Sequence, residues 1–159
     1  MVTHELAAKF DTFITIRRYH TMSRYKSKQM AYSPLKKKNV PIWRLDTNTM
    51  TVTYFNPETL TEESKTYHTD YIRYHLHYSA SKYPDRLRRL VNEGKIMEYL
   101  DNMEMKVSKA IDSQVELWKK SDKEYQAAVL CGDTDKAKGL ENCLVYMARE
   151  AIFECMVYV

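Results

Sequence analysis

The sequence predicts a mainly α-helical protein: an antiparallel helical bundle around a long central helix, preceded by a small β-hairpin and a basic N-terminal helix or arm. Between positions 95 and 130, apolar residues recur at spacings of three and four, as on one face of an α-helix. The 159 residues include only three Gly and four Pro, the residues that most often interrupt helices. Hydrophobic residues make up 44% of the chain, which is enough for a buried core. We therefore expect a helical unit over 61–159 and an N-terminal region over 1–60.

The N-terminal region is predicted to begin with a helix. Thr3 is a suitable N-cap, and Leu6, Phe10 and Phe13 supply apolar side chains behind it. A β-hairpin is expected at about 41–55, because residues 50–55 alternate in the period of two that is typical of a strand. Residues 46–49 (Asp-Thr-Asn-Thr) favour the turn that this hairpin needs.

The next elements are predicted to be helices. Asn56 followed by Pro57 resembles an N-cap with proline at the first helical position, so we expect a helix from there to about Ser79. Tyrosines at positions 67, 71, 74 and 78 would form its aromatic face. Pro84 then starts a short helix over 85–92.

Two long helices are expected after residue 94. Gly94 and Gly132 are natural breaks, so the first helix is predicted to run from 95 to 130 and the last from about 135 to 157. Each has one apolar stripe that it cannot bury alone. The two helices should therefore pack antiparallel as an αα-hairpin.

Positive charge is concentrated at the start of the chain. Residues 1–44 carry ten Lys or Arg against two acidic residues, a local net charge of +8, whereas the whole chain carries +4. Basic side chains neutralise phosphates, and tyrosine rings stack on bases. The predicted nucleic-acid-binding residues are Arg17, Arg18, Arg24, Lys26, Lys28, Lys36, Lys37 and Lys38, with Tyr19 and Tyr25 as stacking rings. An acidic protein surface as the partner, and a merely solvated basic face, are the alternatives.

No catalytic, metal or cofactor motif is recognisable in the sequence. His68 and His75 would lie about 10 Å apart along a helix, which is too far for two ligands of one zinc ion. The three cysteines have no CxxC spacing, and we expect reduced, mostly packed thiols in a cytoplasmic protein. No apolar run is long enough to span a membrane or to form the core of a signal peptide. A non-enzymatic protein without a cofactor is therefore predicted.

Two segments carry a resemblance to a known family. They are IRYHLHYSASKYPDRLRRLVNEGKIMEYLDNME, starting at Ile72, and KGLENCLVYMAREAIFECMVYV at the end of the chain. Over about residues 71–159 the chain resembles the transposon-encoded TnpV-like proteins, which are small proteins of mobile genetic elements. The positions that match the family pattern are Gly94, Leu100, Asn142, Arg149, Glu150, Glu154 and Tyr158. The resemblance implies a mobile-element accessory protein and no catalytic residue.

The predicted function is non-enzymatic binding of DNA, RNA or a nucleic-acid–protein complex through the basic N-terminal region. A second hypothesis is an inhibitor of a host defence nuclease, such as an anti-CRISPR protein acting on a CRISPR effector. Its acidic contact residues would be Glu58, Glu62, Glu63 and Asp70. A third is a structural homo-oligomer, because nine Met and the apolar helical stripes favour self-association.

Overall fold

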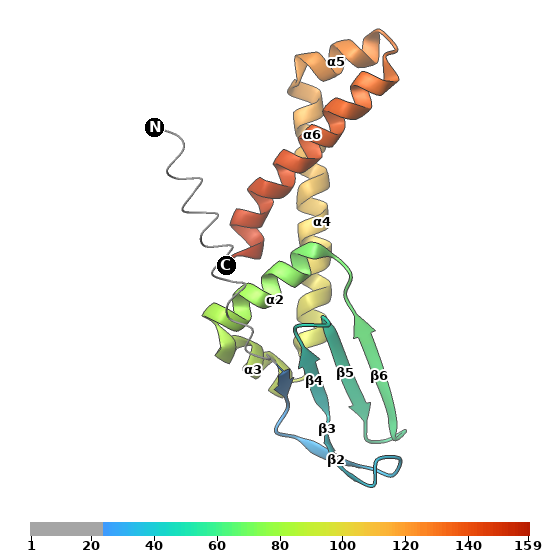
Figure 1. The fold of residues 1–159 in the computed structure, drawn as a ribbon, viewed down its shortest axis with the longest axis vertical. Helices are drawn as coiled ribbons and strands as arrows, with labels where there is room; N and C mark the ends of the chain where they lie inside the picture. Colours follow the sequence, from blue (N-terminus) through green and yellow to red (C-terminus); the bar gives the residue numbers. More distant parts are fainter. Residues whose placement is uncertain (1–23) are drawn as a thin grey trace.

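The computed structural model describes residues 24–159, which form an α+β fold (Figure 1). The strands are β1 (Arg24–Lys26), β2 (Met30–Ser33), β3 (Lys38–Pro41), β4 (Trp43–Asp46), β5 (Thr51–Asn56) and β6 (Thr61–Thr66). The helices are α2 (Asp70–Lys82), α3 (Pro84–Asn92), α4 (Ile96–Ser121), α5 (Lys123–Leu130), α6 (Thr134–Ile152) and the π-helix η1 (Phe153–Val157). The prediction of a mainly α-helical bundle was therefore wrong. The helix predicted from Thr3 lies outside the described residues.

The first error concerns the basic arm, which from residue 24 onward is β structure. Strand β1 pairs antiparallel with β4 at one edge of a four-stranded sheet of order β1-β4-β5-β6, and β2 and β3 form a separate hairpin. Residues 24–28 alternate between exposed basic and buried side chains. That period of two is the strand signal, and the density of charge obscured it.

The second error concerns residues 57–66, which were predicted to begin a helix. Asn56 Oδ1 instead accepts hydrogen bonds from the backbone N–H groups of Glu58 (2.9 Å) and Thr59 (3.4 Å), which makes a turn. Strand β6 follows and pairs with β5 along its whole length. This segment has no apolar stripe to bury as a helix, whereas β5 offers a full ladder of backbone partners. The boundary expected at residue 60 falls inside this β-hairpin.

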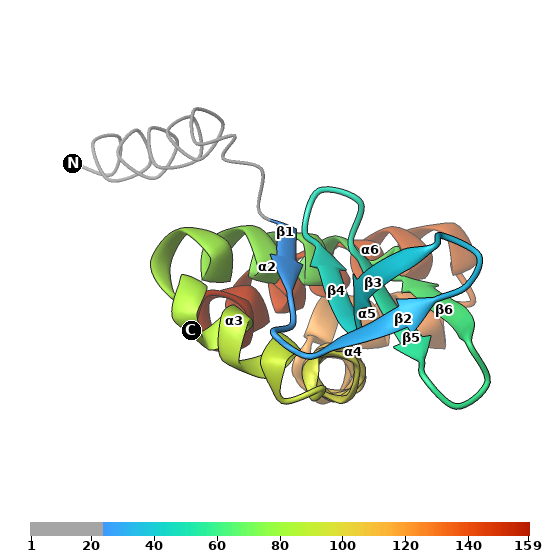
Figure 2. The ribbon, with the colours of Figure 1, turned by 90° about the horizontal axis from the view of Figure 1, so that it is seen from below.

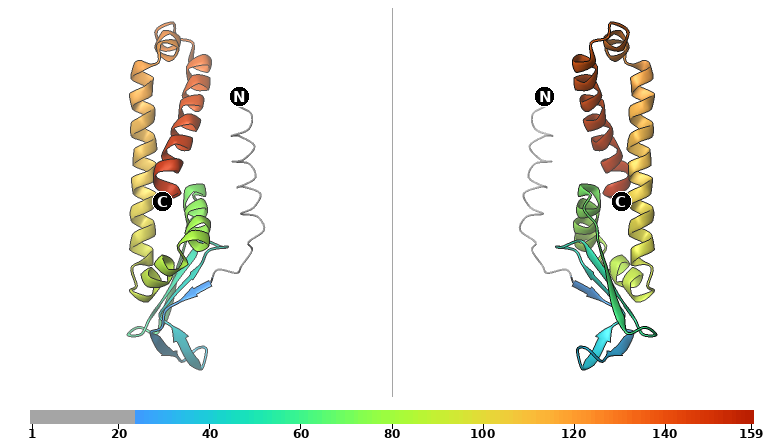
Figure 3. Two further views of the ribbon diagram at one scale, coloured as in Figure 1. Left: turned by 90° about the vertical axis from the view of Figure 1, so that its left-hand side faces the viewer. Right: turned by 90° about the vertical axis from the view of Figure 1, so that its right-hand side faces the viewer.

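Other predictions were confirmed. The hairpin expected at 41–55 is β4–β5, and Pro84 is the first residue of α3. Gly94 and Gly132 break the helices at φ values of 70° and 72°. Helices α4 and α6 pack antiparallel, as the two side views in Figure 3 show.

The helix predicted over 95–130 is divided in two. Helix α4 ends at Ser121, and the Asp122 side chain caps α5 by accepting a 2.7 Å hydrogen bond from the backbone N–H of Tyr125. The Gln126 amide also donates to the Lys119 carbonyl at 2.7 Å. Short helix α5 turns the chain back, so that α6 can run down along α4 (Figure 1).

Two hydrophobic cores are stacked along α4. The lower core lies between the four-stranded sheet, α2, α3 and the start of α4, and it includes Leu45, Val52 and Leu76. The upper core lies between α4, α6 and η1, and it includes Val107 and Ala148. Figure 2 views the molecule from the sheet end and shows hairpin β2–β3 at this end, beside β4 and β5.

Candidate nucleic-acid interface

A hollow with a volume of about 460 Å³ lies where hairpin β2–β3 meets β1 and β4. Four of the side chains around it are cationic. The lining residues are Lys26, Ser27, Met30, Lys36, Lys38, Asn39, Val40, Pro41 and Arg44.

Hydrogen bonds of the Ser27 side chain and the Gln29 backbone fix the chain where β1 leads into hairpin β2–β3. The buried Ser27 hydroxyl donates to the Gln29 carbonyl at 2.9 Å and accepts from the Trp43 N–H at 3.0 Å. The Ile42 N–H donates to the same Gln29 carbonyl at 3.0 Å. These contacts turn the chain sharply between β1 and β2. As a result, cations from three strands and one turn come together.

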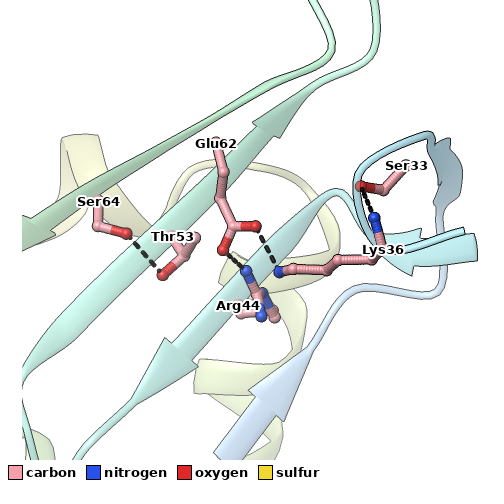
Figure 4. A network of polar contacts seen from close by, with 6 residues as sticks. All are labelled: Ser33, Lys36, Arg44, Thr53, Glu62 and Ser64. Atoms are coloured by element: carbon pink, nitrogen blue, oxygen red, sulfur yellow. Dashed lines mark hydrogen bonds and ion pairs between the residues drawn. The ribbon is translucent and has the colours of Figure 1, made fainter. Parts of the chain in front are cut away.

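One carboxylate partly neutralises the cluster. Glu62 on β6 accepts from Lys36 Nζ at 2.6 Å and pairs with the Arg44 guanidinium (Figure 4). The hydrogen bond from Lys36 and the nearby Arg44 charge outweigh the effect of burial and lower the pKa of Glu62, so it stays ionised at neutral pH.

A net positive charge remains at the hollow. Among the described residues, neither Lys26 nor Lys38 has an ion-pair partner. The Nε atom of Arg44 is buried and lacks a hydrogen-bond partner in residues 24–159. Four cations therefore stand against one carboxylate, which favours an anionic ligand.

The structure separates the predicted nucleic-acid-binding residues into groups. Lys26, Lys36 and Lys38 meet at the hollow, and Arg24 is paired with Asp46 at 3.1 Å. Lys28 and Lys37 are exposed, and each is next in the sequence to a residue that lines the hollow. Residues Arg17, Arg18 and Tyr19 lie outside the described part of the chain.

The stacking role predicted for Tyr25 was wrong. Its side chain is buried in the lower core, because odd-numbered positions of β1 face inward. The exposed aromatic ring nearby is Tyr32 on β2, which is 57% exposed and pairs in register with Asn39 of the hollow. Sequence reasoning also missed Arg44. Side chains alternate between the two faces along each β-strand, and this alternation was the signal that would have distinguished buried from exposed residues.

The four acidic residues of the inhibitor hypothesis are divided between the β5–β6 hairpin, which holds Glu58, Glu62 and Glu63, and the first turn of α2, which holds Asp70. Glu62 is paired with Lys36 and Arg44, and Asp70 is paired with Arg149 of α6. Glu58 and Glu63 are exposed. No described feature therefore favours an acidic contact surface over the basic one.

The histidine and cysteine side chains supply no candidate metal centre in residues 24–159, where no three His, Cys, Asp or Glu side chains gather in a suitable cluster. Buried His75 contacts the Val157 carbonyl through Nδ1 at 2.8 Å and the Tyr99 hydroxyl through Nε2 at 2.7 Å. All three cysteines are exposed, so the prediction of mostly packed thiols was wrong: Cys131 ends α5, and Cys143 in α6 and Cys155 in η1 lie on the surface.

None of the helices between residues 24 and 159 is long and apolar enough to cross a membrane.

Comparisons of the chain with protein-family models, curated proteins and solved structures found no match.

Proposed function

We propose that this protein is a non-enzymatic nucleic-acid-binding protein that holds the phosphate backbone at the basic hollow beneath hairpin β2–β3. The observation that carries the proposal is the convergence of Lys26, Lys36, Lys38 and Arg44 around one cavity. Residues 24–44 contain seven Lys or Arg and no Asp or Glu, so this whole segment attracts polyanions. The resemblance to transposon-encoded proteins is in keeping with a mobile element's nucleic acid, free or in a nucleoprotein complex, as the ligand.

The exposed ring of Tyr32 supports a single-stranded ligand. Single-strand-binding surfaces combine a basic groove for the backbone with aromatic rings on which bases stack. Tyr32 lies across the hairpin from Asn39, which lines the hollow. A single-stranded nucleic acid whose phosphates lie in the hollow therefore has a ring for base stacking nearby, on β2.

Removing the two unpaired cations of the hollow should weaken binding. For the double variant Lys26→Gln/Lys38→Gln we expect roughly tenfold weaker binding of a fluorescein-labelled single strand. The slope of log affinity against log salt should become shallower by about 1.4, because each single-strand phosphate contact contributes about 0.7. Fluorescence anisotropy over a series of salt concentrations measures both quantities.

The chain offers a matched control variant and a variant that should strengthen binding instead of weakening it. Lys106→Gln/Lys109→Gln removes the same charge from an exposed part of α4 and should leave both quantities unchanged. Glu62→Gln should tighten binding several-fold, because it releases Lys36 and Arg44 from their carboxylate. Equal losses in the hollow variant and the α4 variant would show that only total charge matters and would overturn the proposal.

Tyr32→Ala should separate single strands from duplexes. Loss of one base–aromatic stack costs about 1–3 kcal/mol, so single-strand affinity should fall at least several-fold. Duplex affinity should change little, since paired bases cannot reach the ring. Tyr83, which is similarly exposed at 47% but lies between α2 and α3, provides the control substitution Tyr83→Ala. An unchanged single-strand affinity for Tyr32→Ala would contradict the stacking role.

A further inference from the structure

Helix α6 has an apolar face that no described residue covers. Its inner face, with Leu144 and Ala148, packs against α4 in the upper core. On the outer face, Tyr146 is 65% exposed and Met147 is 53% exposed, and Cys143 is also exposed. Large apolar side chains side by side on one helix face are typical of an interaction surface.

A glycine lies on the same face of α6, and no contact within the described residues requires a glycine there. Gly139 is an interior residue of α6, and a Cβ atom built there would meet nothing within 4 Å. Glycine destabilises a helix interior by about 1 kcal/mol relative to alanine. Small residues on helix surfaces allow a second helix to approach closely, so Gly139 points to a helical partner.

We infer that this face is a self-association surface, on which α6 of a second copy packs antiparallel across a twofold axis at Cys143. At 3.6 residues per turn, positions 136, 139, 143, 146, 147 and 150 fall within about 100° of the helix circumference. A twofold axis at position 143 places each residue of one copy opposite the residue of the second copy that lies the same number of positions from 143 in the other direction. Cys143 then lies opposite Cys143 of the second copy.

This register is complementary in both charge and size. Lys136 lies opposite Glu150 of the second copy, and the symmetry repeats the pair at the other end. Gly139 lies opposite Met147, so a large exposed side chain meets the smallest residue of the face. Lys136 already contacts Glu124 at 3.1 Å, but both side chains are more than half exposed, and such a pair exchanges readily.

The surface is independent of the basic hollow. Helix α6 runs from the α5 end of the molecule towards the sheet end (Figure 1), so antiparallel copies place their sheets at opposite ends of the dimer. Both hollows remain open. Nucleic-acid binding and dimerisation can therefore fail separately in experiments.

The native cysteines provide the first test. Three variants, each keeping one cysteine and carrying Ser at the other two positions, are treated with a short bismaleimide crosslinker, and dimers are resolved on a denaturing gel. We expect a crosslinked dimer when Cys143 is kept and none when Cys131 or Cys155 is kept. Equal crosslinking of all three exposed thiols, or none at Cys143, would overturn the inference.

Charge exchange provides the second test, by sedimentation equilibrium of the whole chain. Lys136→Glu and Glu150→Lys should each raise the dimer Kd by roughly tenfold, because each breaks two symmetric ion pairs. The combined variant should recover most of the affinity. Gly139→Leu should give a folded monomer, because a Cβ atom at this position meets nothing within 4 Å in the described chain. A monomeric unmodified protein at high micromolar concentration, or a combined variant no better than the single ones, would overturn the inference.

Discussion

Gly94→Ala is expected to destabilise the protein by about 2–4 kcal/mol, because two separate penalties meet at this residue. Gly94 has a φ of 70°, where L-residues are strained. A Cβ atom there would also lie 2.7 Å from Nε1 of Trp43. The indole cannot easily move, since it packs against the lower core and lies 4.5 Å from the Tyr54 ring. Urea unfolding followed by circular dichroism measures the loss.

The other two glycines separate these penalties. Gly132→Ala carries the same backbone strain at φ 72° with no neighbour within 4 Å, so it should cost only about 1 kcal/mol. Gly139→Ala lies inside a helix in open space and, at low protein concentration, should stabilise by about 0.5–1 kcal/mol. If Gly94→Ala costs no more than Gly132→Ala, the close contact between the α3–α4 junction and Trp43 is wrong.

His75→Ala is expected to destabilise the protein by about 3–5 kcal/mol. The imidazole is 1% exposed and joins three elements of the fold. It donates to the Val157 carbonyl at 2.8 Å, and its other nitrogen accepts from the Tyr99 hydroxyl at 2.7 Å. Alanine would leave the buried Val157 carbonyl and the partly buried Tyr99 hydroxyl without this hydrogen-bond partner and would open a cavity. His68→Ala, at an exposed position, is the control and should be close to neutral.

The same residue makes stability depend on pH. Burial lowers the pKa of His75, the nearby Arg86 charge lowers it further, and the hydrogen bond to Val157 only partly opposes this. The unfolded chain therefore takes up the proton first as pH falls. The contribution is complete above about pH 6.5, the ordinary histidine value, and is lost as pH falls below it. Urea unfolding between neutral and mildly acidic pH should show this loss in the unmodified protein. If His75→Ala shows the same fall, another group is responsible.

Much of the helical half of this protein was predictable from the sequence. The apolar spacing in α4 and α6 and the breaks at Gly94 and Gly132 are local signals, and they were confirmed. The exception is the break at Asp122, which looks like one more polar residue on a helix surface. Its role as a cap depends on the backbone turning there, and that turn is stabilised when α6 packs back on α4.

The sheet was predictable only in its middle. Strand β5 carries a run of β-branched and aromatic residues directly after the turn that follows β4, which is a local pattern. Strand β6 has six exposed polar residues, and its strand conformation depends on the ladder that β5 offers. Strand β1 is short and highly charged, and its pairing with β4 joins residues about twenty positions apart. Such long-range pairing leaves little trace in the sequence of an edge strand.

The sequence by itself determined that a basic, tyrosine-containing segment precedes the helices, since charge and composition are properties of the chain alone. Only the tertiary structure decided which of these side chains meet. Folding buries Tyr25, exposes Tyr32, brings Arg44 to the hollow and places Glu62 between two cations. The physical reason is that successive side chains of a β-strand point to opposite faces of the sheet. Which side chains can contact a ligand at this site therefore depends on which face of the sheet packs against the core.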